Sequence, residues 1–295
     1  MTKTDASDND GQPNKGGRSV GHGTPEPDGE PAKPDKGVSG ELAQDRQTPP
    51  ARAASLWGRI ADAAAGLSQH LGPNGILIII LGIGMAVFFA LSVAAAEVYD
   101  QVTDKDGVAG LDRPMLDLAI SLRSPWADAT LTWYTNMAGT YGMPLIAIVA
   151  IIILSLRRRS WTPAILIAAA GAGSLLMTVA GKLIFGRDRP ALADAVPPYE
   201  SSASFPSGHT LNAVAIIGII AYLLVKRQKR RWARVITLSV AALFVITTGL
   251  TRVFLGHHWF TDVLFAWILG LAWVVAVITA HQLYLAVRAR REQPN

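Results

Sequence analysis

The chain has 295 residues, of which 50% are hydrophobic, and it carries a formal net charge of +5. Because the first fifty residues are polar, the remainder is too apolar for an ordinary soluble domain and predicts an all-α membrane protein. The chain has no cysteine, which excludes disulfides and thiolate metal sites.

The amino-terminal segment differs in composition from the rest of the chain. Residues 1–54 are rich in proline, glycine and charged side chains. Such a segment buries too little apolar surface to offset its chain entropy, so we predict a disordered cytoplasmic tail. It has no apolar core near Met1 and therefore does not resemble a secretory signal. In residues 55–72, apolar side chains recur at helical spacing, which predicts an interfacial helix.

Residues 73–290 form the predicted membrane domain. A transmembrane helix needs about 20 apolar residues, and the sequence offers six such segments. Between the first two, Leu111–Leu122 is amphipathic and is predicted to lie on the membrane as a cover. The predicted spans are Gly75–Ala96, Asn136–Leu156, Trp161–Gly181, His209–Val225, Val235–Leu250 and Asp262–Val287.

Basic residues set the orientation of these spans. Clusters at 157–159, 226–234 and 288–291, together with the bases before the first span, all fall on one side of a six-span chain. The positive-inside rule makes that side cytoplasmic, with both termini. A nucleic-acid patch is the competing interpretation. We disfavour it, and predict no nucleic-acid partner, because each cluster lies at a helix end as a solvated anchor would.

The opposite side should be poor in bases, yet the segment KLIFGRDRP, 182–190, carries Lys182, Arg187 and Arg189 at a span end. Charges there are costly unless they have a partner or a task. The plain alternative is that they anchor the helix end. For Arg187, contact with a second phosphate or a lipid headgroup and a simple pair with Asp188 stay equally open.

A second segment, FPSGHT, 205–210, directly precedes the fourth span. Ser207 and Gly208 at a helix start leave backbone N–H groups free, and the helix dipole adds positive potential, which suits phosphate. His209 lies in the first turn. The alternative is an ordinary N-cap by Ser207 beside an incidental histidine.

A third segment, TRVFLGHHWFTD, 251–262, joins the fifth and sixth spans. His258 and Asp262 are four residues apart, so they share a helix face if the helix starts before His258. An aspartate that accepts from Nδ1–H leaves Nε2 free to act as a base or nucleophile. Two alternatives are a metal pair extended by His209, and an ion pair between Arg252 and Asp262.

All three segments fall on the predicted outer side. Together they supply bases for phosphoryl oxygens, a helix N-terminus, an oriented histidine and a second histidine. These are the parts that phosphoryl transfer through a covalent intermediate requires. The sequence has no carboxylate cluster for a metal, so arginine and lysine would do that work, and we expect no metal and no cofactor.

The three segments resemble the signature of the type 2 phosphatidic acid phosphatase (PAP2) superfamily, K-x6-RP, PSGH and SR-x5-H-x3-D. Thr251 stands where the pattern usually has serine, which keeps a hydroxyl. The matching residues are Lys182, Arg189 and Pro190, then Pro206 to His209, then Arg252, His258 and Asp262.

The resemblance implies a role for each matching residue. His258 would be the nucleophile that becomes phosphohistidine, Asp262 would orient it, and His209 would protonate the leaving group and then activate water. The residues that would bind phosphoryl oxygens are Lys182, Arg189, Ser207, Gly208 and Arg252. Spacing selects His258 over His257, which is expected to have a structural or substrate-edge part.

The function expected from this resemblance is a metal-independent membrane lipid phosphatase with its active site on the outer face. Its expected substrates are of the phosphatidate, phosphatidylglycerophosphate or undecaprenyl diphosphate type. The alternatives are a phosphosugar or other phosphomonoester phosphatase of the same fold, and a non-enzymatic protein that handles lipids or anions. The sequence carries no indication of an oligomeric state.

Overall fold

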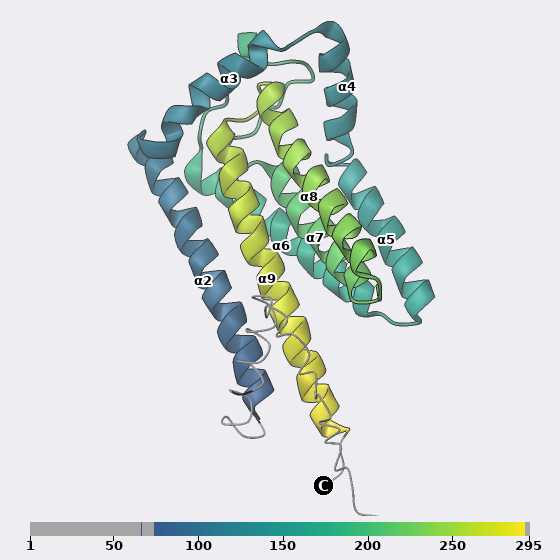
Figure 1. Ribbon diagram of the computed structural model, residues 1–295. Coiled ribbons are helices and arrows are strands. Elements are labelled where there is room, and N and C mark those ends of the chain that lie inside the picture. The colour runs from purple at the N-terminus through teal and green to yellow at the C-terminus, as the bar shows by residue number, and fades with distance from the viewer. Residues whose placement is uncertain (1–65, 67–73, 293–295) are drawn as a thin grey trace, which may run out of the picture. The chain divides into compact units, whose positions relative to one another are not determined.

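The computed structural model describes residue 66 and residues 74–292. The predicted tail of residues 1–54 lies outside the described residues, as does the predicted interfacial helix of residues 55–72 except for Gly66. The described part is helical, and no strand occurs within residues 74–292. Its long helices lie side by side as a bundle (Figure 1).

Within residues 74–292, five helices are long and apolar enough to cross a membrane. A further helix, α5, has 17 residues, Gly142–Arg158, at the lower limit of spanning length. Its apolar composition suits a span, but a sixth crossing stays a prediction. The five are α2 (Gly75–Asp104), α6 (Thr162–Phe185), α7 (Gly208–Val225), α8 (Arg231–Phe254) and α9 (Phe260–Arg291).

Helix α7 lies at the centre of the bundle, packed against α6, α8 and α9. It carries many buried apolar residues, including Leu211, Val214 and Ile219. Close packing depends on small residues, since a Cβ added at Gly270 of α9 would approach Val214 to 2.7 Å. Helix α2 instead packs along α9 and leaves large apolar side chains such as Phe89 exposed at 68%, as a lipid-facing helix would.

Two short helices, α3 (Asp112–Ser121) and α4 (Pro125–Asn136), lie between α2 and α5. Figure 1 shows α3 across the end of the bundle where α8 ends and α9 begins, which agrees with its packing against both helices. The predicted cover is therefore present as a helix. Leu116 at its centre is fully buried.

The predicted second span began too early. Asn136 is the last residue of α4, and the chain turns before α5 begins at Gly142. A Cβ at Gly142 would lie 2.4 Å from the carbonyl oxygen of Asn136, so the turn requires a glycine there. Hydropathy continues across this turn, which is why the predicted span began at Asn136 and not at Gly142.

Candidate active site

Four helix ends bring the three sequence segments together. Lys182 lies in the last turn of α6, and Arg252 lies in the last turn of α8. Ser207 is the N-cap residue of α7, followed by Gly208 and His209. Arg189 lies on the connection between α6 and α7, while Asp262 lies in the first turn of α9.

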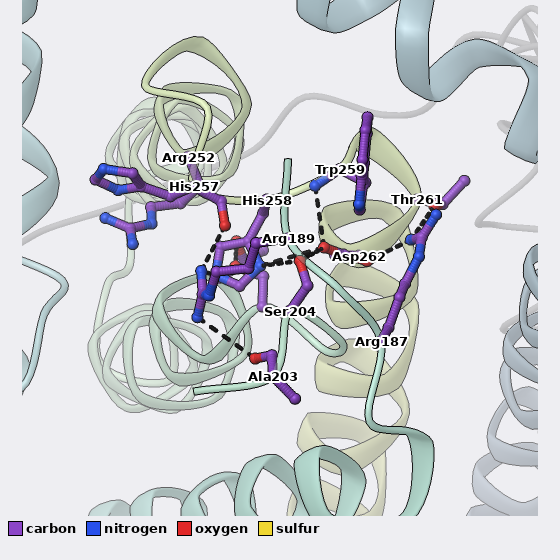
Figure 2. A network of polar contacts seen from close by, with 12 residues as sticks. Arg187, Arg189, Ala203, Ser204, Arg252, His257, His258, Trp259, Thr261 and Asp262 are labelled. Atoms are coloured by element: carbon purple, nitrogen blue, oxygen red, sulfur yellow. Dashed lines mark hydrogen bonds and ion pairs between the residues drawn. The ribbon is translucent and has the colours of Figure 1, made fainter. Parts of the chain in front are cut away.

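His258 and Asp262 contact each other as predicted, but not on one helix. Helix α9 begins at Phe260, with Trp259 as its N-cap residue, so His258 precedes the helix. Its Nδ1 lies 3.3 Å from Oδ2 of Asp262. The backbone N–H of Trp259 donates to the same oxygen at 3.0 Å, and Ser204 also donates to it. The turn before α9 therefore brings the imidazole to the carboxylate (Figure 2).

The other ring nitrogen of His258 faces a cation. Nε2 lies 3.3 Å from Nη1 of Arg189, and the side chain is only 1% exposed. Burial lowers the pKa of His258 well below its usual value, and the nearby Arg252 and Arg189 lower it further. Burial and the two neighbouring guanidinium groups therefore both favour the neutral form of the imidazole. With Nδ1–H directed to Asp262, the lone pair of the ring lies on Nε2, where it faces Nη1 of Arg189.

The three expected phosphate-binding cations converge on residues 200–203. Lys182 donates to Ser202 Oγ at 3.0 Å, Arg189 donates to the Ser202 carbonyl at 2.7 Å, and Arg252 donates to the carboxylate of Glu200. The Nε–H of Arg252 is buried without a hydrogen-bond partner in the described part of the chain. A buried guanidinium N–H without a partner costs free energy of folding. An anion oxygen placed there could accept this hydrogen bond.

Glu200 is a site residue that the sequence motifs do not reveal. Burial alone would raise its pKa, but Arg252, His209 and Arg189 outweigh burial and lower the pKa to about 2. The group is therefore a carboxylate under all ordinary conditions. Its carboxylate contacts Arg189 and Arg252, the same guanidinium groups that are expected to bind phosphoryl oxygens.

Ser207, Gly208 and His209 form the start of α7. Ser207 is fully buried, and its hydroxyl bonds Thr210 at 2.9 Å rather than the helix backbone, so it is not an ordinary side-chain cap. A Cβ at Gly208 would lie 2.9 Å from Thr178, which explains the glycine. The ring of His209 is half-buried, and its Nε2 lies against Gly139.

A cavity of about 570 Å³ connects these groups to the middle of the bundle. One end is lined by polar residues of the site, among them Lys182, Glu200, His209 and His258. The remainder is lined by apolar side chains of α5, α6 and α7, including Met143, Ile148, Ile167, Leu175 and Ile216. The cavity thus joins a polar end, which includes Lys182 and both histidines, to an apolar wall.

Of the two interpretations left open for Arg187, contact with a second phosphate or a lipid headgroup stays a prediction, and the contacts of Arg187 contradict the other. It donates to Asp262 Oδ1 at 2.5 Å and to Asp112 Oδ2 at 2.6 Å. The predicted pair with Asp188 is therefore wrong. So is an ion pair between Arg252 and Asp262, since Arg252 pairs with Glu200.

The contacts of His257 indicate a structural role. Its Nε2 lies 2.7 Å from the carbonyl oxygen of Val196, and its carbonyl accepts from Arg189. The adjacent Gly256 has φ +70°, and a Cβ there would approach the carbonyl oxygen of Asp194 to 2.1 Å. These contacts hold the α8–α9 connection against residues 194–196.

No metal-binding arrangement accompanies these residues in the part of the chain that the structure describes. Within residues 74–292, no three histidine, aspartate or glutamate side chains are placed to hold one ion together. His209, His258 and Asp262 do not form such a group.

Several known proteins resemble this chain in sequence. The PAP2 superfamily profile matches residues 161–285. Phosphatidylglycerophosphatase B of Bacillus subtilis (strain 168) is 31% identical over 192 residues, which cover 64% of this chain and 89% of that protein. Undecaprenyl-diphosphatase BcrC of the same strain is 36% identical over 97 residues, 32% of this chain and 45% of the relative.

A solved structure extends the agreement to the fold. It is the crystal structure of a transmembrane PAP2 type phosphatidylglycerolphosphate phosphatase from Bacillus subtilis, with 26% identity and a TM-score of 0.58. The match covers 68% of this chain and 96% of that one. Sequence signature, helical bundle and relatives thus agree, and the chain belongs to the PAP2 superfamily of membrane phosphatases.

Proposed function

We propose that this protein is an integral-membrane lipid phosphatase that acts at the outer face through a phosphohistidine on His258. One observation carries the proposal: a single cavity is lined at one end by His258, His209 and Lys182 and along its length by apolar side chains of α5, α6 and α7. A molecule with a phosphate head and a hydrocarbon tail has the matching chemistry.

The first step of the proposed reaction forms a bond between His258 Nε2 and phosphorus. Lys182, Arg189 and Arg252 neutralise the phosphoryl oxygens, and Asp262 stabilises the imidazolium that develops. The bond from phosphorus to the leaving oxygen breaks, and His209, which enters this step as the protonated imidazolium, gives that oxygen a proton and becomes neutral. Lys182, Arg189 and Arg252 must exchange their hydrogen bonds to residues 200–203 for hydrogen bonds to the phosphoryl oxygens, because the same N–H groups make both.

The second step hydrolyses the phospho-enzyme. Neutral His209 takes a proton from a water molecule, the water oxygen attacks phosphorus, and the bond to Nε2 breaks. Inorganic phosphate leaves, and His258 returns to its neutral form. The proton that His209 donates in the first step is thus replaced by the proton that it takes from water in the second.

The proposed substrate class is a lipid phosphate or a polyprenyl diphosphate. The two Bacillus subtilis relatives are named for phosphatidylglycerophosphate and undecaprenyl diphosphate, and this supports both headgroup types. A water-soluble phosphosugar would leave the apolar wall of the cavity unused.

Phosphate release from a panel of substrates tests this proposal. Purified protein in detergent is given phosphatidylglycerophosphate, undecaprenyl diphosphate, phosphatidate and a phosphosugar, each with and without EDTA. We expect kcat/KM to be highest for a lipid and to survive EDTA. A preference for the phosphosugar would overturn the lipid assignment, and loss in EDTA with recovery by a divalent ion would overturn the metal-independent mechanism.

A further inference from the structure

Asp262 has a second set of contacts on the side away from His258. Figure 2 shows Arg187 and Thr261 on one side of Asp262, with His258 and Arg189 on the other. Oδ2 is hydrogen-bonded to His258, Ser204 and Trp259, while Oδ1 accepts from Arg187 at 2.5 Å. Each oxygen of the buried carboxylate therefore has its own partners.

Arg187 is itself held by Asp112, the first residue of α3. Nη2 of Arg187 donates to Asp112 Oδ2 at 2.6 Å, and the guanidinium also donates to Thr261 Oγ1 at 2.8 Å. Asp112 in turn accepts from the backbone N–H of Thr261 at 2.8 Å. One carboxylate from the cover helix thus binds both Arg187 and the first turn of α9, where Asp262 lies.

These contacts separate Arg187 from the phosphate-binding groups. Lys182 lines the cavity that contains His258 and His209, whereas Arg187 lines a different cavity of about 710 Å³ with Asp112 and Trp259. The side chain is only 21% exposed, and its guanidinium lies over the Trp259 ring at 5.7 Å. Its donors are directed to Asp112, Thr261 and Asp262 and not to the place of the substrate.

We propose that Arg187 and Asp112 are positioning residues that fix the Asp262 carboxylate for His258, so that the cover helix α3 is part of the catalytic arrangement. A guanidinium donates from two nitrogens in a fixed plane, so a residue bridging two carboxylates restricts both in position. The inference rests on the proposed function, in which Asp262 orients His258.

The test compares kcat and KM of full-length Arg187→Gln and Asp112→Asn proteins with matched controls. Substitution of such outer partners typically lowers activity about 10–100-fold in metal sites, and we expect a fall in kcat of that order here. KM should change little, because neither residue touches the substrate cavity. The loss in the double variant should be smaller than the product of the two single losses, since Asp112 acts in part through Arg187.

Two neighbouring substitutions serve as controls. Arg113→Gln changes the next residue of α3, whose guanidinium pairs with Asp117 and Asp194 at the surface. Asp188→Asn changes the exposed residue next to Arg187. Both should keep kcat within about twofold of the unsubstituted protein, as surface changes usually do.

Chemical rescue separates positioning from a folding defect. Arg187→Ala opens a gap onto the 710 Å³ cavity, into which guanidinium ion fits. Millimolar guanidinium should restore part of kcat in Arg187→Ala and none in Asp262→Ala. Arg187→Lys should recover little activity because an ammonium lacks the planar fork.

The outcomes distinguish this inference from the proposed function. Unchanged kcat in Asp112→Asn, or a loss expressed in KM alone, would overturn the positioning role even with His258→Ala inactive. Full activity in His258→Ala would instead overturn the proposed function. Should Arg187→Gln fail to fold, Asp112→Asn and the guanidinium rescue decide the question.

Discussion

Arg252 donates to the carboxylate of Glu200 inside the candidate site, where a phosphoryl group would also need that guanidinium. The arginine is 2% exposed and keeps one buried donor without a partner in the described part of the chain. Glu200 therefore balances positive charge in the site, and under the proposed function it would compete with substrate for the same donors.

Glu200→Gln should strengthen anion binding. Without the carboxylate, Arg252 and Arg189 lose a competing partner, so inhibition by inorganic phosphate and by vanadate should occur at several-fold lower concentration. Thermal stability should fall, because the buried arginine loses its ion pair. Inhibition constants in both proteins measure the effect, and weaker phosphate inhibition in the variant would show that Glu200 helps to bind the anion.

Arg252→Ala should remove a charge-assisted contact of about 1.5–3 kcal/mol, which corresponds to roughly a 10–150-fold loss in kcat/KM. A larger loss is expected if the contact strengthens in the transition state. Arg252→Lys should restore little of the lost kcat/KM, since an ammonium lacks the planar pair of donors of a guanidinium. Arg230→Ala, at the opposite end of the bundle, is the matched control. Near-normal kcat/KM in Arg252→Ala would remove the residue from the site.

His257 should make the fold sensitive to acid. Burial lowers its pKa from 6.5 to about 4, with Arg252 adding to the effect. Between these values the unfolded chain binds more protons than the folded one, so stability rises with pH across this window and is lost as pH falls. The slope from this group is at most about 1.4 kcal/mol per pH unit.

The measurement is the midpoint of thermal unfolding in detergent between pH 4 and 7. His257→Asn, which cannot titrate, should show a flatter dependence than the unsubstituted protein while keeping most of its activity. An identical pH dependence in the two proteins would show that His257 is not held in its neutral form.

The outward orientation of the site is a prediction from the positions of the basic clusters. Because the chain has no cysteine, single cysteines at Tyr199 and Arg230 can be labelled without background. Both positions are exposed. In intact cells we expect an impermeant maleimide to label position 199 and to spare position 230 until the membrane is opened. The reverse pattern would place the site on the cytoplasmic side.

The sequence predicted the helical class and the three converging segments because both depend on local pattern. Hydropathy located the five long helices and the cover helix, and motif spacing separated His258 from His257. Helix boundaries were less accurate, since apolar composition continues through the turn between α4 and α5. The sixth crossing stays a prediction.

The partners of these groups could not be predicted, because long-range contacts determine them. Glu200 and Asp112 lie 52 and 75 residues from Arg252 and Arg187, their respective partners. Neither acid follows a spacing rule, and Asp112 lies among several other acids between the first two spans. Arg187 lies among the unspecified residues between Lys182 and Arg189, and Asp188 offered a nearer partner in sequence than the two carboxylates that the fold supplies.

The central claim is that His258 is the nucleophile, and trapping the phospho-enzyme tests it most directly. Protein is mixed with phosphorus-labelled lipid substrate, quenched in denaturant at alkaline pH, and analysed for an acid-labile phosphate and its position. We expect the label on His258, its absence in His258→Ala, and its persistence in His257→Ala. In His209→Ala, a substrate with a good leaving group should still form the intermediate, which should then hydrolyse slowly. Label on His257, or label that survives in His258→Ala, would contradict the mechanism.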